Sequence, residues 1–183
     1  MGKIRENIDE RLRLWIAAQR LFFVATAPAG REGHINCSPK GADSFRIIDE
    51  NTAAYLDFTG SGAETIAHLR ENGRIVVMFC AFEGPPQIAR LHGRGEVVLP
   101  GEKTFEELKG LFPDKRGVRS IIRVHVRRVS TSCGFSVPLY DFKEDRRVLD
   151  EWVERKSDAE IIDYQRKNNA VSIDGIPALK LED

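Results

Sequence analysis

Ser38, Pro39, Lys40 and Gly41 stand together where an expected strand ends, and Lys40 is the residue there with clear binding chemistry. Pro39 lacks an N–H group, so the strand either ends at this point or lies at the edge of a sheet. The Lys40 ammonium is a compact charge with three donors, which suits a phosphate group. A surface lysine taken by itself is more commonly only solvated, and this alternative stays open.

A second candidate site is the corner 58–65, which leads from an expected strand into an expected helix. The first turn of a helix has unpaired N–H groups and a partial positive charge, and both attract anions. Gly60 and Gly62 let an anion approach the backbone closely, while Ser61 and Thr65 add hydroxyl donors. The corner lacks the third glycine of a dinucleotide-binding fingerprint and the Gly-Lys-Ser/Thr ending of a P-loop. An ordinary helix cap on a tight turn is the alternative.

The other residues with chemical potential are scattered along the chain. His34, His68, His92 and His125 have no spacing typical of a metal site, so no metal ion is expected. Arg90 and His92 share one face of an expected strand, which either borders a polar cleft or is simply half exposed. No Ser-His-Asp or Cys-His arrangement can be assembled from the spacing, so a hydrolase is not predicted.

These candidates must be positioned by a series of short strands with few helices between them. Turn residues and alternating apolar residues predict strands at 21–27, 34–38, 44–48, 52–57, 75–82, 88–99 and 120–129. Helical periodicity predicts helices at about 7–21, from after Gly62 to Asn72, and at 104–111, 144–156 and 158–168. Strands at short intervals with turns between them are typical of a sandwich or a barrel.

The composition is that of an ordinary globular domain. The 183 residues are 42% hydrophobic, and Lys plus Arg equals Asp plus Glu at 28 each. With no net charge, the chain is not expected to bind nucleic acid or an anionic membrane. Its three cysteines are odd in number and widely spaced, which favours a reducing, cytoplasmic setting. The sequence predicts neither a secretory signal nor a membrane span.

Taken in order, these segments resemble the pyridoxamine 5'-phosphate oxidase-like family, whose members are flavin proteins with a split β-barrel fold. The likeness runs from about residue 21 to residue 98. It is carried by Asn36-Cys37-Ser38-Pro39-Lys40-Gly41, Tyr55-Leu56-Asp57-Phe58-Thr59-Gly60-Ser61-Gly62, Leu69-Arg70-Glu71-Asn72 and Arg90-Leu91-His92-Gly93-Arg94-Gly95. Residues 132–141 and 168–177 look like the C-terminal part of an uncharacterised branch of that family.

The resemblance implies an α+β fold, an antiparallel Greek-key barrel of six or seven strands with flanking helices. Residues 1–183 would form a single FMN-binding split-barrel domain. Its helices and tail from about 141 to 183 would pack on the barrel or on a partner subunit. Members of the family are homodimers that hold FMN at the subunit interface.

The same resemblance implies roles for particular residues. The strand ending at Cys37, Ser38 and Pro39 would run along the flavin ring with its main-chain groups, and Lys40 would meet the phosphate. Further residues fall on the family's cofactor-binding positions, namely Phe58 and Thr59 where it has a Tyr-Thr or similar pair, and Ser61, Gly62 and Thr65 on the phosphate-binding turn. Arg90 completes the candidate cofactor-binding residues.

Two departures from the family narrow the expected function. True oxidases usually have Ser-Arg-Lys where this chain has Ala63-Glu64-Thr65, and their C-terminal Arg-x-His segment has no counterpart after Val129. Vitamin B6 oxidation is therefore not predicted. We expect an FMN-dependent oxidoreductase of unknown substrate, with a nicotinamide or a deazaflavin among the candidate electron donors. The alternatives are a non-catalytic flavin- or haem-binding carrier or sensor, and a dimeric interaction domain with an empty cleft.

Overall fold

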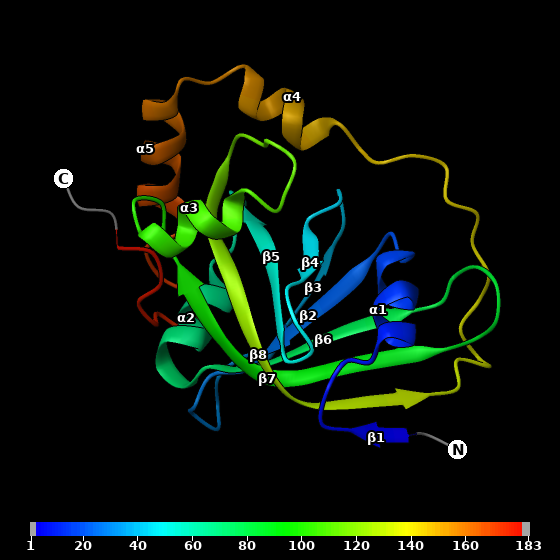
Figure 1. The fold of residues 1–183 in the computed structure, drawn as a ribbon. Coiled ribbons are helices and arrows are strands. Elements are labelled where there is room, and N and C mark those ends of the chain that lie inside the picture. The colour runs from blue at the N-terminus through cyan, green and yellow to red at the C-terminus, as the bar shows by residue number, and fades with distance from the viewer. Residues whose placement is uncertain (1–2, 181–183) are drawn as a thin grey trace.

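The computed structural model describes residues 3–180, which form a curled antiparallel sheet with helices around it (Figure 1). The spatial order is β3-β2-β6-β7-β8-β5-β4, and β1 pairs with β8 outside this path. Because β3 and β4 remain at opposite ends of this order, the sheet is a half-barrel with an open side. The strands are β1 (Lys3–Arg5), β2 (Phe22–Thr26), β3 (Asn36–Lys40), β4 (Phe45–Ile47), β5 (Thr52–Phe58), β6 (Arg74–Cys80), β7 (Ile88–Val98) and β8 (Val118–Ser132).

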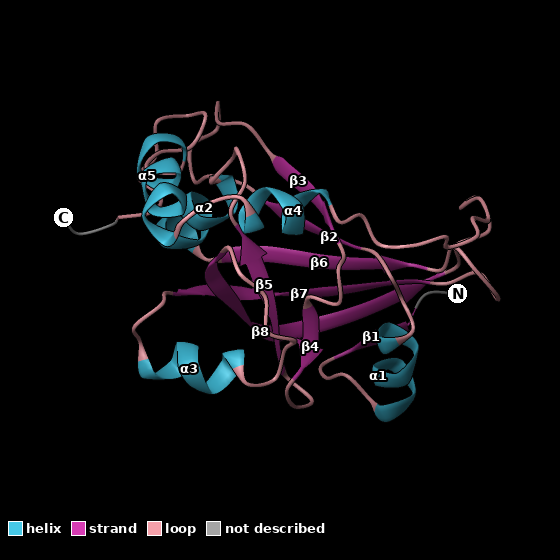
Figure 2. Ribbon diagram, turned by 90° about the horizontal axis from the view of Figure 1, so that it is seen from above, coloured by secondary structure: helices cyan, strands magenta, loops and turns pink. Residues whose placement is uncertain are grey.

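The helices lie on both sides of the sheet. Seen from above, α2, α4 and α5 lie to one side of the strands and α1 and α3 to the other (Figure 2). Asp9 begins the first helix by accepting the Leu12 N–H at 2.8 Å, and Ser157 and Glu160 form a capping box at the start of the last. The bounds are α1 (Glu10–Ala17), α2 (Glu64–Asn72), α3 (Lys103–Lys109), α4 (Val148–Glu154) and α5 (Asp158–Asn168).

The main hydrophobic core fills the inner face of the half-barrel. Side chains alternate between the two faces of a strand, so every second residue of β2 and β6 points inward. Helix α1 covers this core with Leu12 and Ile16, and α2 contributes Leu69. The buried strand residues of this cluster are Phe22, Val24, Tyr55, Ile75, Val77, Phe79, Ala89, Leu91, Ile122, Val124, Val126 and Val129.

Two smaller clusters complete the packing. Helix α3 packs with Phe105 and Leu108 against Leu56 of β5 and Ile121 of β8. Helix α2 packs with Ile66 and its neighbours against the buried tail residues Ala178 and Leu179. The C-terminal tail is thus anchored on the helix that follows the corner 58–65.

The half-barrel with its helices confirms the fold class predicted from the sequence, while several boundaries differ. Helix α1 is shorter than the expected range 7–21, and α4 is only part of the expected helix 144–156. Pro39 lies inside the edge strand β3, one of the two placements that its missing N–H allows. Strand β1 was not expected, because a segment this short carries no periodic signal before it pairs with β8. The predicted tail extends to 183, and its part at 181–183 lies outside the described residues.

Gly93 is a position where the sheet admits no side chain. It lies where β7 changes register against β8, and a Cβ atom there would collide with the carbonyl oxygen of His125. We expect Gly93→Ala to lower the free energy of unfolding by about 1–3 kcal/mol, the usual cost of overpacking. Chemical denaturation measures this change. Gly30→Ala is the matched control, because a Cβ at position 30 meets nothing within 4 Å. Equal stability of the two variants would contradict the prediction.

Candidate functional site

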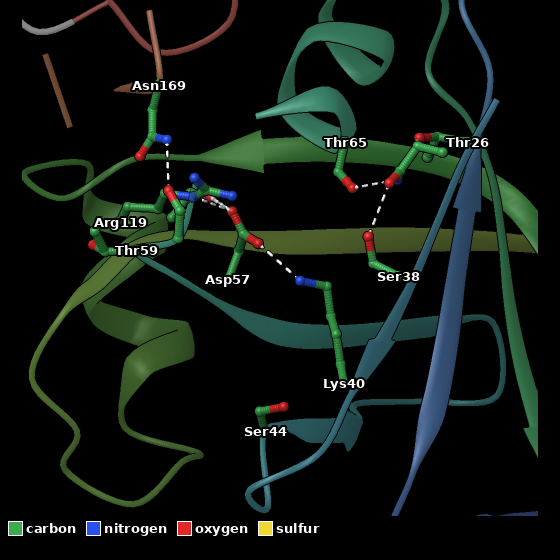
Figure 3. Close-up of polar contacts among 12 residues, drawn as sticks. Thr26, Ser38, Lys40, Ser44, Asp57, Thr59, Thr65, Arg119 and Asn169 are labelled. Carbon is green, nitrogen blue, oxygen red and sulfur yellow. Dashed lines mark hydrogen bonds and ion pairs between the residues drawn. The ribbon is translucent and has the colours of Figure 1, made fainter. Parts of the chain in front are cut away.

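Lys40 and Asp57 meet across the open side of the half-barrel (Figure 3). Lys40 ends β3 at one end of the strand order, while Asp57 lies in β5, next to the other end. The Lys40 Nζ is 3.1 Å from Asp57 Oδ1 and 5.5 Å from the centre of the Tyr55 ring. We call this region the barrel gap, lined by Asn36, Ser38 and Lys40 from β3 and by Asp57 from β5.

Asp57 is the electrostatic centre of the barrel gap. Its side chain is 0% exposed, and besides Lys40 it accepts hydrogen bonds from Arg119 Nε at 2.8 Å and from Ser120 Oγ at 3.2 Å. Burial would raise the pKa of this carboxyl, but the nearby charges of Lys40 and Arg119 outweigh burial and hold the pKa below its usual value of 3.8. Asp57 is therefore ionised at neutral pH, and the trio of Lys40, Asp57 and Arg119 carries a net charge of +1.

A β-bulge places Arg119 beside Asp57. Asp57 pairs with Ser120 across β5 and β8, yet the next residue, Phe58, pairs with Val118, which leaves Arg119 as the extra residue. A bulge re-aims a side chain that regular pairing would direct elsewhere. The Nη1 atom of Arg119 is buried and has no hydrogen-bond partner within residues 3–180.

Asn36 organises a second polar group beside the gap. Its Nδ2 donates to Thr26 Oγ1 at 3.1 Å and to Thr65 Oγ1 at 3.0 Å, while its Oδ1 accepts from Ser38 Oγ at 2.8 Å. The Thr26 hydroxyl also contacts Nδ1 of the buried His68 at 2.9 Å. Burial lowers the pKa of His68, so its imidazole is neutral at pH 7. This network fixes Ser38 of β3 and Thr65 of α2 close to each other.

The corner 58–65 is held in place by the C-terminal part of the chain. The Thr59 hydroxyl donates to the Gly117 carbonyl oxygen at 2.9 Å and accepts from Gln165 Nε2 at 2.7 Å. Asn169 Nδ2 donates to the carbonyl oxygen of Gly60 at 2.8 Å. Helix α5 and the residue after it therefore fix the backbone that leads into α2.

Glu64 occupies the start of the helix at this corner. Its carboxylate fills the space that a Cβ atom on Gly62 would need, and its Oε1 accepts from the Ile173 N–H at 3.3 Å. A carboxylate in the first turn is favoured by the helix dipole. Phe58 packs against the cluster under α3, and Ser61 is exposed. An anion at this corner would share the helix start with Glu64.

The remaining predicted residues, Cys37, Pro39 and Arg90, lie on the outer face of the sheet. In β3, Cys37 and Pro39 alternate with the side chains that line the barrel gap, while Arg90 lies in β7. Pro39 pairs with Phe23, Phe23 with Met78 and Met78 with Arg90, so these residues form one row across three strand pairs. Only Ser38, Lys40 and Thr65 of the predicted set are brought together near the gap.

Three residues of the site were missed by the sequence reasoning. Asp57 had a signal, since a charged residue within an apolar strand must be buried with a partner or turned to solvent. Asn36 also had one, because it shares the face of Ser38 and Lys40 at a spacing of two residues. Arg119 had none, because its position depends on a bulge.

A pocket of about 430 Å³ opens beside the Lys40 end of β3. Gly41, which follows Lys40, and Phe22, which pairs with Lys40 across β2 and β3, both line it. Phe45 adds a second aromatic wall, and Arg20 adds a charged group. Apolar walls with a few polar groups are typical of small-molecule sites.

Comparisons with known proteins define the family of this half-barrel. A family model described as pyridoxamine 5'-phosphate oxidase matches residues 8–133. The chain belongs to the pyridoxamine 5'-phosphate oxidase family. A relative from Aspergillus flavus, "Pyridoxamine 5'-phosphate oxidase family protein ustO", is 39% identical over 191 residues, covering 95% of this chain and 76% of the fungal protein.

Solved structures agree with the fold described above. HupZ of Group A Streptococcus is 28% identical with a TM-score of 0.54, over 67% of this chain and 91% of that one. A putative pyridoxamine 5'-phosphate oxidase from Lactobacillus delbrueckii is 14% identical with a TM-score of 0.52, over 68% of this chain and 98% of that one. At that identity the second structure shows the fold alone. The split-barrel fold predicted from the sequence is confirmed.

Within residues 3–180, no helix combines the length and the apolar character needed to cross a membrane. The same residues contain no group of three or more His, Cys, Asp or Glu side chains that could hold a metal ion.

The buried carboxylate of Asp57 predicts a specific sensitivity to acid. Its pKa in the folded state lies below 3.8, so its ionised form stabilises the fold above roughly pH 4, and this stabilisation is lost as the pH falls through the lower folded-state value. We expect Asp57→Asn to be less stable than the wild type at neutral pH, because it weakens the contacts with two cations. We also expect it to lose less unfolding free energy than the wild type between about pH 5 and pH 2, because the amide does not titrate.

Urea denaturation at a series of pH values measures this difference. Asp114→Asn, at an exposed carboxylate, is the control and should lose stability in acid as the wild type does. Equal pH slopes for the wild type and Asp57→Asn would show that Asp57 does not carry the acid sensitivity.

Proposed function

We propose that this family member is a flavoprotein that binds FMN without a covalent bond and acts as an oxidoreductase. The observation that carries the proposal is the net positive charge of the trio in the barrel gap, where Lys40 and Arg119 outnumber the single carboxylate of Asp57. A phosphate needs such a local charge, because the chain as a whole has none. Membership of a family of flavin proteins supports FMN as the source of the phosphate.

The residues of the gap fit the phosphate end of FMN. The Lys40 side chain is 19% exposed, and the buried Nη1 of Arg119 is a donor that still needs an acceptor. Ser38 and Thr65 supply hydroxyl groups beside them. Glu64 brings negative charge to the start of α2, so the proposal assigns the charge of the phosphate to Lys40 more than to the helix N-terminus.

The flavin ring would supply the chemistry, and the chain would bind and orient it. FMN, when bound, provides hydride or single-electron transfer at its isoalloxazine ring. The backbone of Cys37 and Pro39 and the side chain of Arg90 are the proposed cofactor contacts on the outer face. No described side chain is assigned as a catalytic acid or base, so the substrate is left open. A nicotinamide or a deazaflavin is the proposed class of electron donor.

A second copy of the chain is the proposed partner for the outer face. Phe23, Ala25, Val76 and Met78 are half-buried there and belong to none of the hydrophobic clusters. Apolar side chains grouped on a sheet face favour association with another surface. A homodimer formed in this way would bring Arg90 to the interface, where the family holds FMN.

A cytoplasmic location completes the proposal. It is supported by the cysteines, since Cys37, Cys80 and Cys133 are all free and two of them are exposed. Exposed free thiols fit a reducing compartment.

Lys40→Ala tests the phosphate contact. The freshly purified wild-type protein should show the visible absorption bands of a flavin. In apoprotein titrated with FMN, we expect Lys40→Ala to raise the Kd by about 10- to 100-fold, because a hydrogen bond to a charged group is lost. Quenching of FMN fluorescence measures the Kd.

Lys109→Ala is the matched control, because the ion pair of Lys109 with the exposed Asp114 is long, at 3.8 Å. Its Kd should equal that of the wild type. An unchanged Kd for Lys40→Ala would remove Lys40 from the site. A Soret band in the purified protein would favour the haem-binding alternative, and a colourless protein that takes up no FMN would favour the interaction domain.

Met78→Glu tests the proposed dimer. A charge at the centre of the outer face would have to be buried against the second copy, which is costly without a partner. We expect the wild type to sediment as a dimer and Met78→Glu to sediment as a monomer at micromolar concentration. Lys103→Glu, at a side chain that is 91% exposed on α3, is the control and should remain dimeric. A monomeric wild type would contradict the prediction.

A further inference from the structure

Lys40, Asp57 and Arg119 form a charge arrangement that an isolated structural ion pair would not need. One cation would suffice to neutralise the buried carboxylate, yet Asp57 contacts two, Lys40 at 3.1 Å and Arg119 at 2.8 Å. The excess positive charge is not spread evenly. The side chains of Asp57 and Arg119 are 0% and 5% exposed, while that of Lys40 is 19% exposed. The accessible part of the trio is therefore its lysine.

Arg119 provides a second, independent observation. Its side chain is almost fully buried, and its Nη1 has no acceptor anywhere in the part of the chain that the structure describes. A guanidinium donor that is buried without an acceptor is costly to keep. A ligand oxygen can supply this acceptor, as can a water molecule that a ligand is able to replace.

We propose that this trio is an oxyanion-binding unit in which the buried Arg119 makes Lys40 available to the ligand. Asp57 positions both cations, and Arg119 prevents Asp57 from cancelling the charge of Lys40. The ligand is a phosphate or carboxylate group, carried either by FMN or by a substrate. The first source rests on the proposed function, while the second does not require it.

The electrostatics make Arg119 necessary. A lysine paired with one carboxylate is a neutral dipole, and its attraction for a further anion falls off quickly with distance. A trio with a net charge of +1 in a poorly hydrated gap keeps a longer-ranged attraction, because the surrounding dielectric is lower than that of water. The lysine must also keep donors for the ligand while it contacts Asp57. The Arg119 and Ser120 bonds to Oδ2 serve this purpose, because they leave only Oδ1 for Lys40.

A charge-compensation series tests the unit. Arg119→Met removes the second cation and leaves Lys40 neutralised by Asp57, so the trio falls from +1 to 0. The double variant Asp57→Asn with Arg119→Met removes one charge of each sign and returns the site to +1. The affinities of the apoproteins for FMN and for riboflavin are measured side by side, because the two ligands differ only in the phosphate.

We expect Arg119→Met to weaken FMN binding by about 10- to 100-fold and to change riboflavin binding by less than about twofold. We expect the double variant to recover most of the affinity for FMN. A residue that matters only for folding would give the opposite result, because the double variant lacks two buried partners and would be the poorer binder of both ligands. Equal losses for FMN and riboflavin, or a double variant no better than Arg119→Met, would overturn the proposal.

Two further variants distinguish a loss of ligand binding from a failure to fold. Arg119→Lys keeps the charge and should keep the preference for FMN over riboflavin, even where the protein is less stable. Arg116→Met, at a half-exposed arginine of the preceding loop, is the matched control and should leave both affinities unchanged. The variant Arg119→Lys could instead be as stable as the wild type and still lose its preference for FMN. That result would overturn the proposal that the positive charge at position 119 supports binding of the phosphate.

Inorganic phosphate separates this proposal from the proposed function. Should the wild type bind neither FMN nor riboflavin, the flavin proposal fails, and the trio is then tested by thermal denaturation in phosphate against chloride at equal ionic strength. A higher Tm in phosphate for the wild type but not for Arg119→Met supports the unit with a substrate as the source of the oxyanion. No phosphate effect on the wild type overturns it. Where FMN does bind, competition by phosphate assigns the site to the cofactor, and phosphate binding to the FMN-loaded protein assigns it to a substrate.

Discussion

Asp57 is a fully buried carboxylate near the end of the mostly apolar strand β5, and two cations compensate its charge. Leaving such a group unpaired would cost more than a small domain can tolerate. Lys40 lies in β3, at the opposite end of the strand order from β5, so it can contact Asp57 only because the sheet is curled. Arg119 lies in the neighbouring strand β8 and contacts Asp57 because that strand has a bulge at this position. The curvature of the half-barrel, the bulge in β8 and the length of β3 are thus tied to one carboxylate.

The parts of the fold that could be predicted from the sequence are those that produce a local residue pattern. Alternating apolar residues located most strands, and helical spacing located the helices. Short or irregular pieces, such as β1, depend on pairing with distant residues and leave no local pattern. The same distinction applies to the site. Lys40 and Thr65 were predicted from their residue types and their neighbours in the sequence. Arg119 belongs to the site because of a register shift between β5 and β8, which residue spacing does not predict.

At the corner 58–65, the helix N-terminus that was predicted to attract an anion is already occupied by the carboxylate of Glu64. A helix N-terminus attracts anions, and in this chain an anion is already present there, because Glu64 is in the first turn. The tail strengthens this arrangement, since the Ile173 N–H bonds the same carboxylate and Asn169 fixes the backbone of Gly60. Charge recognition at the open side of the barrel is consequently shifted from the backbone of the helix to the side chains of Lys40 and Arg119.

Strand β3 connects the two surfaces on which the proposed function depends. As an edge strand it carries Ser38 and Lys40 toward the barrel gap and Cys37 and Pro39 toward the outer face, because successive side chains alternate. A cofactor that contacts both sets must lie along this edge, between the gap of one copy and the outer face of another. Binding of FMN and association of two chains would then share the same strand. Each would stabilise the other through mass action, since a ligand that binds only the assembled form raises the population of that form.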